Sequence, residues 1–408
     1  MWKKPLYFIS WIYLFAITII LDIPLSRAII INNYPLPITS TGIVVYTQPS
    51  FSNLITQQYV HQYSQDHNLT TSLSTSSTSI IPPRPARQLY DVFCYNGEIS
   101  LLLWRLKHLG SIVSTFIIIE GDHTHQGNPK ASKLTPSIKE QIASTGANVV
   151  YITAALVARQ DNFSVDDRWQ LAKENELRQR DAGTSYILAN SQDDDMVIIG
   201  DVDELPDPEY LKKWHTFPSI GKVRAKMFYY SFECLHVYYW YSQAIASVHA
   251  IKQVMHKSKA GRLVYNIGLT RGILVSPNYK SLTGLSESDV PLNMIRFMLR
   301  LVIPLHYLGS SDKNDVGWHC SYCMSPADMQ NKLRSFSHIE YSGDAYTSLS
   351  HIYKAVSNCY SLFSNGDDGT FIRRPVGVDI PPLADTIEQT TSANVQEYIK
   401  KLNLSVSV

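Results

Sequence analysis

From Leu89 onward, short apolar segments alternate with segments of helical periodicity, and this alternation constrains the fold more than any other feature of the chain. Strand composition marks residues 89–95, 115–119, 148–152 and 196–199, and helical spacing marks 98–109, 137–145 and 167–190. Because these strands are largely apolar, we expect an α/β, Rossmann-like, mostly parallel sheet with helices on both faces. Ligands of such sheets bind outside the carboxyl ends of the strands.

The strand at 196–199 runs directly into the segment 200–206 (GDVDELP), which places three carboxylates at a strand end. So much negative charge needs a cation or hydrogen-bond donors to offset it. Alternate side chains of an extended segment point the same way, so Asp201 and Asp203 can share one ligand region. A hard divalent cation on a nucleotide diphosphate suits these oxygens, and a solvated acidic turn is the alternative.

Other classes that use similar residues fit less well. Phosphohydrolases of the haloacid dehalogenase type place Asp-x-Asp near the start of their domain, whereas here it lies mid-domain and is followed by Glu204. The chain has no G-x-x-x-x-G-K-[ST] loop, which excludes ordinary nucleoside triphosphatases. Its 36 Lys and Arg residues balance 35 Asp and Glu residues, so its charge gives no argument for a nucleic-acid partner.

A second cluster of chemistry-bearing residues lies at 317–323 (GWHCSYC). Cys-x-x-Cys beside a histidine suggests zinc or redox chemistry, but no second Cys-x-x-Cys supplies further zinc ligands. We expect Trp318 and His319 to line the site, where they contact the acceptor or shape the cleft. The odd total of five cysteines leaves at least one outside an internal pair. Lumenal disulfides are expected among four of them: Cys320, Cys323, Cys94 and Cys359.

The N-terminus predicts the compartment. Two lysines precede an apolar run from Pro5 to Leu21, at the short end of what spans a bilayer. We expect residues 1–27 to be a cytoplasmic tip and signal-anchor, which makes a single-pass type II membrane protein with a lumenal body. A cleaved signal peptide is the alternative. Residues 28–87, low in charge and containing a Ser/Thr/Pro-rich stretch, are expected to form a stem.

Five blocks resemble glycosyltransferase family 17, over roughly residues 88–375, which leaves a C-terminal tail at 376–408 outside the catalytic domain. The blocks are Tyr90-Asp91-Val92-Phe93 with Glu98 and Arg105; Ile118-Ile119-Glu120 with Thr124 and Gly127-Asn128-Pro129-Lys130; Trp169, Glu174 and Arg178; residues 201–206; and Gly317 to Cys323 followed by Lys332-Leu333 and Ser335-Phe336-Ser337-His338. The family often has an acidic residue at the position of Gly200 and Phe at that of Met324. Neither departure removes a carboxylate of the Asp-x-Asp.

The resemblance implies a GT-A type fold and particular roles for individual residues. Asp203 would hold Mn²⁺ or Mg²⁺ on the diphosphate, Asp201 would contact the ribose or the metal, and His338 would complete the metal shell. The resemblance also implies nucleotide-sugar contacts from Glu120, Lys130 and Arg178. The general base is left open between Asp328 and Glu204, with Asp315 as a further rival.

The implied reaction is an inverting transfer of N-acetylglucosamine from UDP-N-acetylglucosamine, in β-1,4 linkage to the core β-mannose of glycoprotein N-glycans, at the lumenal side of the Golgi membrane. Another donor or acceptor sugar is an alternative. A lumenal glycan-binding protein without turnover and a metallohydrolase are two further alternatives from other classes.

Overall fold

The computed structural model describes residues 86–259, 282, 291–293, 295–296, 307–308, 316–364, 366, 369–375, 380–382, 384–391, 393–395 and 397. The expected membrane segment at 1–27 and nearly all of the stem lie outside this part of the chain. Within it, no helix is both long and apolar enough to cross a bilayer. A compact unit begins at Arg87 and extends to Val408.

The main sheet, as far as the structure describes it, has seven strands in the order β10-β6-β9-β4-β1-β2-β3. Neighbouring strands are parallel, except that β9 is antiparallel to β4 and to β6. The expected α/β class and mostly parallel sheet are therefore confirmed. The strands are β1 Leu89–Cys94, β2 Thr115–Gly121, β3 Val149–Ala154, β4 Met196–Asp201, β6 Ile220–Val223, β9 Ala244–Ser247 and β10 Tyr307–Leu308.

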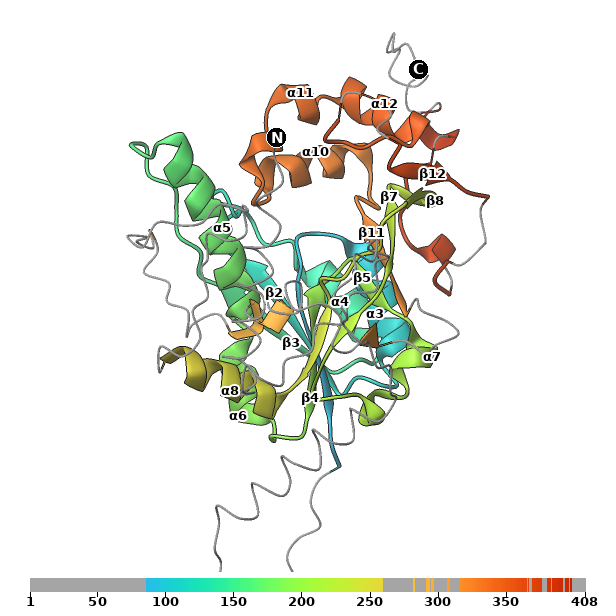
Figure 1. The fold of residues 1–408 in the computed structure, drawn as a ribbon. Coiled ribbons are helices and arrows are strands. Elements are labelled where there is room, and N and C mark those ends of the chain that lie inside the picture. The colour runs from blue at the N-terminus through green and yellow to red at the C-terminus, as the bar shows by residue number, and fades with distance from the viewer. Residues whose placement is uncertain are drawn as a thin grey trace, which may run out of the picture. The chain divides into compact units, whose positions relative to one another are not determined.

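Helices cover both faces of the main sheet, as expected (Figure 1). In the strand order, the connections from β1 to β2 and from β2 to β3 move toward one edge of the sheet, whereas the connection from β3 to β4 moves back toward the other edge. Right-handed crossovers therefore place α3 and α4 on one face and α5 and α6 on the opposite face. The helices are α3 Ile99–Leu109, α4 Pro136–Ala143, α5 Val165–Asp181, α6 Thr184–Asn190 and α8 Val248–Lys259.

The single helix expected at 167–190 is wrong in one respect, because the structure divides it into α5 and α6 near Gly183. The backbone of Gly183 lies so close to the sheet that an added Cβ would be 2.8 Å from Val92 Cγ2 and 3.1 Å from Ile119 Cδ1. Only glycine tolerates this approach, so packing against the sheet selects the residue at this break.

A second sheet carries the order β12-β8-β7-β11-β5 in the described residues. In Figure 1 it lies with α10, α11 and α12 beyond the carboxyl ends of β1 and β4. Its strands are β5 Glu204–Pro206, β7 Lys226–Tyr229, β8 Ser231–His236, β11 Gly317–Ser321 and β12 Phe371–Arg373. The remaining helices are α7 Pro208–Leu211, α10 Pro326–Ser335, α11 Asp344–Thr347 and α12 Leu349–Asn358, with 3₁₀ turns at Trp214–Thr216, Ile339–Tyr341 and Ala384–Thr386.

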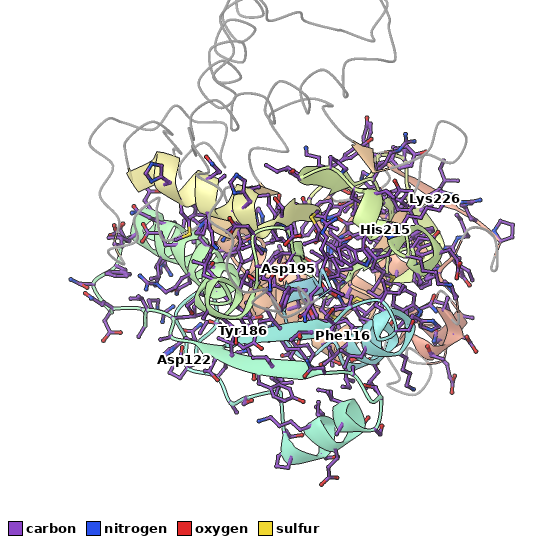
Figure 2. The ribbon with its side chains drawn as sticks, turned by 90° about the horizontal axis from the view of Figure 1, so that it is seen from below. Phe116, Asp122, Tyr186, Asp195, His215 and Lys226 are labelled. Atoms are coloured by element: carbon purple, nitrogen blue, oxygen red, sulfur yellow. A yellow bond between two sulfur atoms is a disulfide. The ribbon has the colours of Figure 1, made fainter. Side chains whose placement is uncertain are left out.

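Hydrogen bonds to one aspartate join the amino ends of two central strands. Figure 2 views this end, where Asp195 lies just before β4. Its carboxylate accepts hydrogen bonds from the backbone N–H groups of Gln88, at 2.8 Å, and Gln192, at 2.7 Å. These bonds tie the start of β1 to the start of β4.

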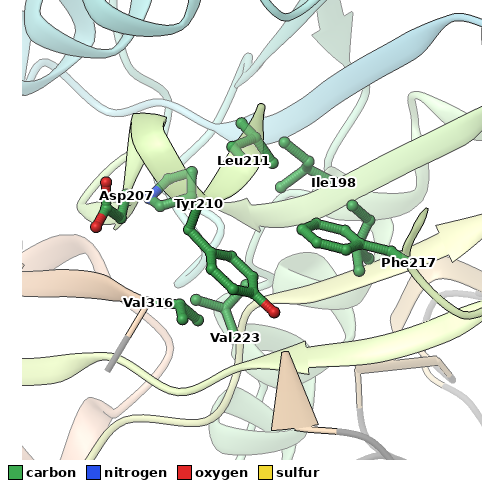
Figure 3. Close-up of a pocket in the computed structure, with 9 residues that line it drawn as sticks. Ile198, Asp207, Tyr210, Leu211, Phe217, Val223 and Val316 are labelled. Carbon is green, nitrogen blue, oxygen red and sulfur yellow. The ribbon is translucent and has the colours of Figure 1, made fainter. Parts of the chain in front are cut away.

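A small apolar void lies between β4, β6 and α7 (Figure 3). Its volume is about 10 Å³, and its lining includes Ile198, Tyr210 and Phe217. A space of this size holds at most one water molecule, and apolar voids of this kind stay dry. We therefore assign it to core packing.

The tail expected from residue 376 packs on the domain where the structure describes it. Trp104 Nε1 donates to the carbonyl oxygen of Pro382 at 2.6 Å, and Thr390 Oγ1 donates to that of Met324 at 2.6 Å. Val395 is fully buried in the second hydrophobic cluster. This part of the tail therefore belongs to the same compact unit as the sheets.

Arg105 on α3 is fully buried and joins three segments of the fold. Its Nε and Nη2 atoms donate to the two carboxylate oxygens of Asp91 on β1, at 2.6 and 2.7 Å. Its Nη1 atom donates to the carbonyl oxygen of Glu204 and, at 3.4 Å, to that of Asp201. This side chain therefore connects α3, β1 and the carboxylate loop, residues 200–204.

Replacing this guanidinium should destabilise the whole unit. Arg105→Met leaves Asp91 as a buried charge without its partner, which we expect to lower the free energy of unfolding by about 3–5 kcal/mol. The matched control, Lys107→Met, removes an exposed cation from the same helix and should change it by less than about 0.5 kcal/mol. Urea unfolding measures both. Equal midpoints for the two variants would contradict the assigned role of Arg105.

Candidate active site

The carboxylate loop lies at the carboxyl end of β4, where it turns from one sheet into the other. Asp201 ends β4 beside Cys94 of β1, and Glu204 begins β5. Val202, between the two aspartates, is buried in the main hydrophobic cluster, as the alternation of side chains predicts. The local sequence therefore places apolar and acidic side chains on different sides of one turn.

Two arginines surround the Asp201 carboxylate. Its Oδ1 lies 2.8 Å from Arg180 Nη2 on α5, and its Oδ2 lies 3.2 Å from Arg296 Nη2. Burial alone would raise the pKa of Asp201, but the two guanidinium charges outweigh burial and hold it well below its usual range. Asp201 is therefore ionised at any physiological pH.

Glu204 is buried, and both of its carboxylate oxygens have hydrogen-bond or ion-pair partners. Its carboxylate accepts hydrogen bonds from Trp240 Nε1 at 2.5 Å and from the backbone N–H of Asp201 at 2.8 Å. It also forms an ion pair with Arg296, at 3.0 Å. Glu204, one of the two candidate bases, does not line the cleft described below. Its contacts instead position Asp201 and Arg296.

Asp203 contacts a lysine on one oxygen and faces a histidine with the other. Its Oδ2 lies 3.0 Å from Lys332 Nζ on α10, which also lies 3.1 Å from Glu98 Oε1. Burial would lower the pKa of Lys332, but these two carboxylates outweigh burial and raise it well above its usual range. The Oδ1 atom lies 3.7 Å from Nδ1 of His319, whose ring stacks on Trp240.

The buried Nδ1 of His319 makes no hydrogen bond in the part of the chain that the structure describes, which is also true of Nδ1 of His125 in the same cleft. The ring is held in place by Trp240, with centroids 4.5 Å apart and planes inclined by 9°. A buried polar atom without a partner is costly and calls for an explanation, and a catalytic role is one such explanation. Trp318, its neighbour on β11, packs instead against the main hydrophobic cluster.

A cleft of about 430 Å³ opens at the carboxyl ends of β1 and β4. Its charged lining residues come mainly from these strand ends and from α5 and α10: Glu98, Lys130, Glu176, Arg180, Asp201, Asp203 and Lys332. Its aromatic lining residues come from the second sheet and the segments beyond it, except Tyr95, which directly follows β1: Tyr95, Tyr229, Trp240, Tyr322, Phe336, Tyr341 and Phe363. The cleft therefore joins a charged region to an aromatic one.

Glu120 and Lys130 lie together at the side of this cleft. Lys130 Nζ lies 3.3 Å from Glu120 Oε1 and donates to Asn96 Oδ1 at 2.9 Å. Glu120 also accepts a hydrogen bond from Ser132 Oγ at 2.6 Å. Of the pair, Lys130 lines the cleft, while Glu120 holds it in place from behind.

The structure does not gather His338 and Asp328 around the aspartates. His338 lines the cleft, but its ring nitrogens already lie 2.9 Å from Glu340 Oε1 and 3.2 Å from Lys173 Nζ. Asp328 is exposed in the first turn of α10, where its carboxylate accepts a hydrogen bond from Ser325 Oγ at 2.6 Å. This is a helix-capping arrangement, and Asp328 does not line the cleft.

The cleft lining includes Arg180 rather than the expected Arg178. Two residues along a helix correspond to a rotation of about 200°, so the two side chains leave α5 on nearly opposite sides. Sequence reasoning also missed Arg296, whose surroundings in the sequence carry no recognisable motif. Lys332 belongs to one of the blocks that resemble the family, but the sequence predicted no role for it. The available signal was a basic residue on the helix that follows the cysteine block.

The disulfides differ from the expected set. Cys320 pairs with Cys323, and Cys359 pairs with Cys234, which was not among the four candidates. Cys94 is a free thiol, so the prediction that it forms a disulfide is wrong. Burial raises the pKa of Cys94 to about 12, so it stays protonated despite lining the cleft. We therefore assign it no nucleophilic role.

The described residues contain no cluster of three His, Cys, Asp or Glu side chains arranged to hold a metal ion. Mg²⁺ sites that act on phosphates commonly use one or two carboxylates, with substrate oxygens and water as the remaining ligands. The Asp203 Oδ1 atom fits that pattern, since it lines the cleft and makes no hydrogen bond within the described residues. The donor set therefore fits a cation shared with a bound diphosphate.

Comparison with known proteins identifies relatives of this chain. The family model of glycosyltransferase family 17 matches residues 24–270. The human and rat proteins named beta-1,4-mannosyl-glycoprotein 4-beta-N-acetylglucosaminyltransferase are each 25% identical over 267 residues. These matches cover 63% of this chain but only 44% of each relative, so the chain spans less than half the length of these relatives.

Among solved structures, glucosyl-3-phosphoglycerate synthase from Mycobacterium tuberculosis, in complex with Mn²⁺, uridine diphosphate and phosphoglyceric acid, is 17% identical. The match covers 73% of this chain and 90% of that chain, with a TM-score of 0.23, too low to support a conclusion. The family assignment stands on the sequence match, which covers more than half of the chain. The chain belongs to glycosyltransferase family 17.

Proposed function

We propose that this protein is an inverting glycosyltransferase that transfers N-acetylglucosamine from UDP-N-acetylglucosamine. The observation that carries the proposal is the pair Asp201 and Asp203 at the carboxyl end of β4, beside a cleft that also contains three cations. A nucleotide-sugar donor brings a diphosphate that such a mixed set of charges can bind. Family membership and the names of the relatives support this class of reaction.

Arg180, Lys130 and Lys332 are the cations that line the cleft, and we assign them to the diphosphate. Arg180 and Lys332 are each held by carboxylates, at 2.8 and 3.0 Å, so their positions are fixed before the donor arrives. Fixed charges stabilise negative charge on a departing diphosphate without reorganising at the moment of reaction. Arg178, Glu120 and Asp201 remain proposed donor-site residues from the sequence, with Glu120 acting through Lys130.

Asp203, together with Asp201, would hold a Mn²⁺ or Mg²⁺ ion, which would neutralise charge on the leaving diphosphate. The two ion pairs of Asp201 make it the weaker ligand, because both its oxygens already face arginines. The His338 contacts to Glu340 and Lys173 would have to break before it could join the site.

Inversion is a single displacement, in which the acceptor oxygen forms a bond to the sugar carbon as the bond to the diphosphate breaks. The acceptor hydroxyl must give its proton to a base within the cleft. Glu204 and Asp328 do not line it, and the third candidate, Asp315, lies outside the described residues, so we propose His319 for this role. Asp203 would orient the ring from Nδ1, as a carboxylate does in other His–Asp pairs, and the 3.7 Å gap would close when substrates bind.

The finer assignments belong to the same proposal. We propose a GT-A type fold, a β-1,4 linkage to the core mannose of glycoprotein N-glycans, and a lumenal catalytic domain at the Golgi membrane. These assignments rest on the sequence pattern and on the relatives' names. A different donor or acceptor sugar would leave the roles of the carboxylate loop unchanged.

Asp203→Asn tests the carboxylate loop. Loss of its charge should lower transfer of labelled N-acetylglucosamine to a glycoprotein by about 100-fold or more, since charge stabilisation of the leaving group is lost. The control Asp166→Asn removes an exposed carboxylate in the first turn of α5 and should leave transfer unchanged. Equal product from wild type and Asp203→Asn would sink the enzymatic proposal and favour a glycan-binding protein.

Removal of the metal gives a separate prediction. A chelator should abolish transfer by the wild-type protein, and added Mn²⁺ or Mg²⁺ should restore it. Calorimetry should show that Mn²⁺ tightens UDP binding to the wild type but not to Asp203→Asn. Release of free sugar without any acceptor would instead indicate a metallohydrolase.

His319→Ala tests the proposed base. Loss of a positioned general base should lower kcat by about 10²–10⁴-fold while the affinity for UDP stays close to that of the wild type. The control His249→Ala removes an exposed histidine on α8 and should leave kcat unchanged. An unchanged kcat in the His319 variant would mean that another group accepts the proton from the acceptor hydroxyl.

A further inference from the structure

Eight aromatic rings form one continuous series that starts inside the cleft and ends in solvent. The series is Phe336, His338, Tyr341, Phe363, Tyr322, Tyr229, His236 and Tyr238, and we call it the ring path. Successive ring centroids lie between 4.3 Å, for Tyr341 and Phe363, and 6.2 Å, for His338 and Tyr341. The first six rings line the cleft, and the last two continue beyond it.

The two ends of the ring path are more exposed than its middle. Tyr229 and Tyr322 are buried in the second hydrophobic cluster, while Phe336, Tyr341 and Phe363 are half-buried and Tyr238 is 68% exposed. Packing alone does not explain an exposed tyrosine at the end of a ring series that begins in a cavity. Aromatic side chains whose faces are open to water are suited to ligands that have both an apolar face and polar edges.

The surface around Tyr238 supports the same interpretation. Seven large hydrophobic side chains are exposed among the described residues, and four of them lie here: Val237, Tyr238, Tyr239 and Ile372. They surround the point where β8 and β12 pair. A concentration of exposed apolar surface marks a binding site more often than scattered residues do. Tyr238 is connected to the rings of the cleft through His236 and the buried ring of Tyr229.

We propose that the two open ends of the ring path form the acceptor site for an oligosaccharide, with sugar rings stacked on Phe336, Tyr341 and Phe363 in the cleft and outer sugars on Tyr238. This rests on the proposed transferase function. Sugar rings present an apolar face to an aromatic ring and hydroxyls to polar groups. Cleft-lining hydroxyls of Ser321, Ser335 and Ser337 lie beside the ring path and can hydrogen bond to the sugar hydroxyls.

The nucleotide is the rival occupant of the ring path. A uracil base stacks on a single ring, and the cations assigned to its diphosphate line the charged part of the cleft. The three half-buried rings of Phe336, Tyr341 and Phe363, together with Tyr238 beyond the cleft, exceed what one base can cover. The path also leads away to solvent at Tyr238, where a long acceptor can extend and a buried nucleotide cannot. The geometry therefore favours the glycan over the nucleotide.

Tyr238→Ala is the main test, because this exposed residue can be changed without disturbing the core. The full-length protein is titrated with the trimannosyl-chitobiose pentasaccharide of N-glycans, with methyl β-mannoside, and with UDP. We expect the variant to weaken pentasaccharide binding by about threefold to tenfold, as loss of one stacked ring should. Binding of methyl β-mannoside and of UDP should stay unchanged.

The matched control is Tyr151→Ala, which removes an exposed tyrosine from β3 at the far edge of the main sheet. It should leave binding of all three ligands unchanged. Tyr341→Ala is the second variant, chosen within the cleft, and it should weaken both the pentasaccharide and methyl β-mannoside. Its melting temperature is compared with that of wild type, so that a folding defect is recognised.

The titrations measure binding without turnover, so they separate this inference from the proposed function. Pentasaccharide binding that depends on Tyr238 supports the acceptor site even if no transfer is observed. Unchanged pentasaccharide affinity in both Tyr238→Ala and Tyr341→Ala would overturn it. Weaker UDP binding in Tyr341→Ala, with glycan binding retained, would also overturn it and assign the rings to the nucleotide.

Discussion

The buried contact between Arg105 and Asp91 is the constraint on which the site depends. The guanidinium uses two nitrogens to hold β1 and turns the third toward the carbonyl oxygens of Asp201 and Glu204. Because these carbonyls face the guanidinium, the loop is held from beneath, by its backbone. The side chains of Asp201 and Asp203 then line the cleft. A bidentate arginine suits this task, because its planar fork fixes direction as well as distance.

The same loop shows how a site can gather three carboxylates without being unstable. Asp201, Asp203 and Glu204 meet Arg180, Arg296 and Lys332, so the charges balance locally. Removing one member would leave a partly buried charge uncompensated, which costs far more than the pair itself contributes. The network therefore fixes the positions of both signs. A diphosphate and a cation, added together, would preserve that balance.

The sequence predicted the first half of the fold and little of the second. The β1 to β4 region alternates apolar strands with periodic helices, and both signals are local. The second sheet is built from strands of three to six residues that pair across long separations, such as β5 with β11. Pairings of that kind leave no periodic trace in the sequence. The close approach of Gly183 to the sheet escaped notice for a similar reason, because Val92 and Ile119, which leave no room for a side chain there, lie elsewhere in the chain.

The residues of the site also divide into those fixed by local sequence and those brought together by long-range contacts. Asp201 and Asp203 could be predicted because a strand end and alternation fix them, whereas Arg296 and the ring path arise only when distant segments meet. The carboxylate loop explains why these parts act together. Glu204 begins β5, which pairs with β11 so that it faces His319, while Asp201 ends β4 of the main sheet. One short segment thus belongs to both sheets, and in the proposed reaction it would bring a donor bound at one sheet next to an acceptor held by the other.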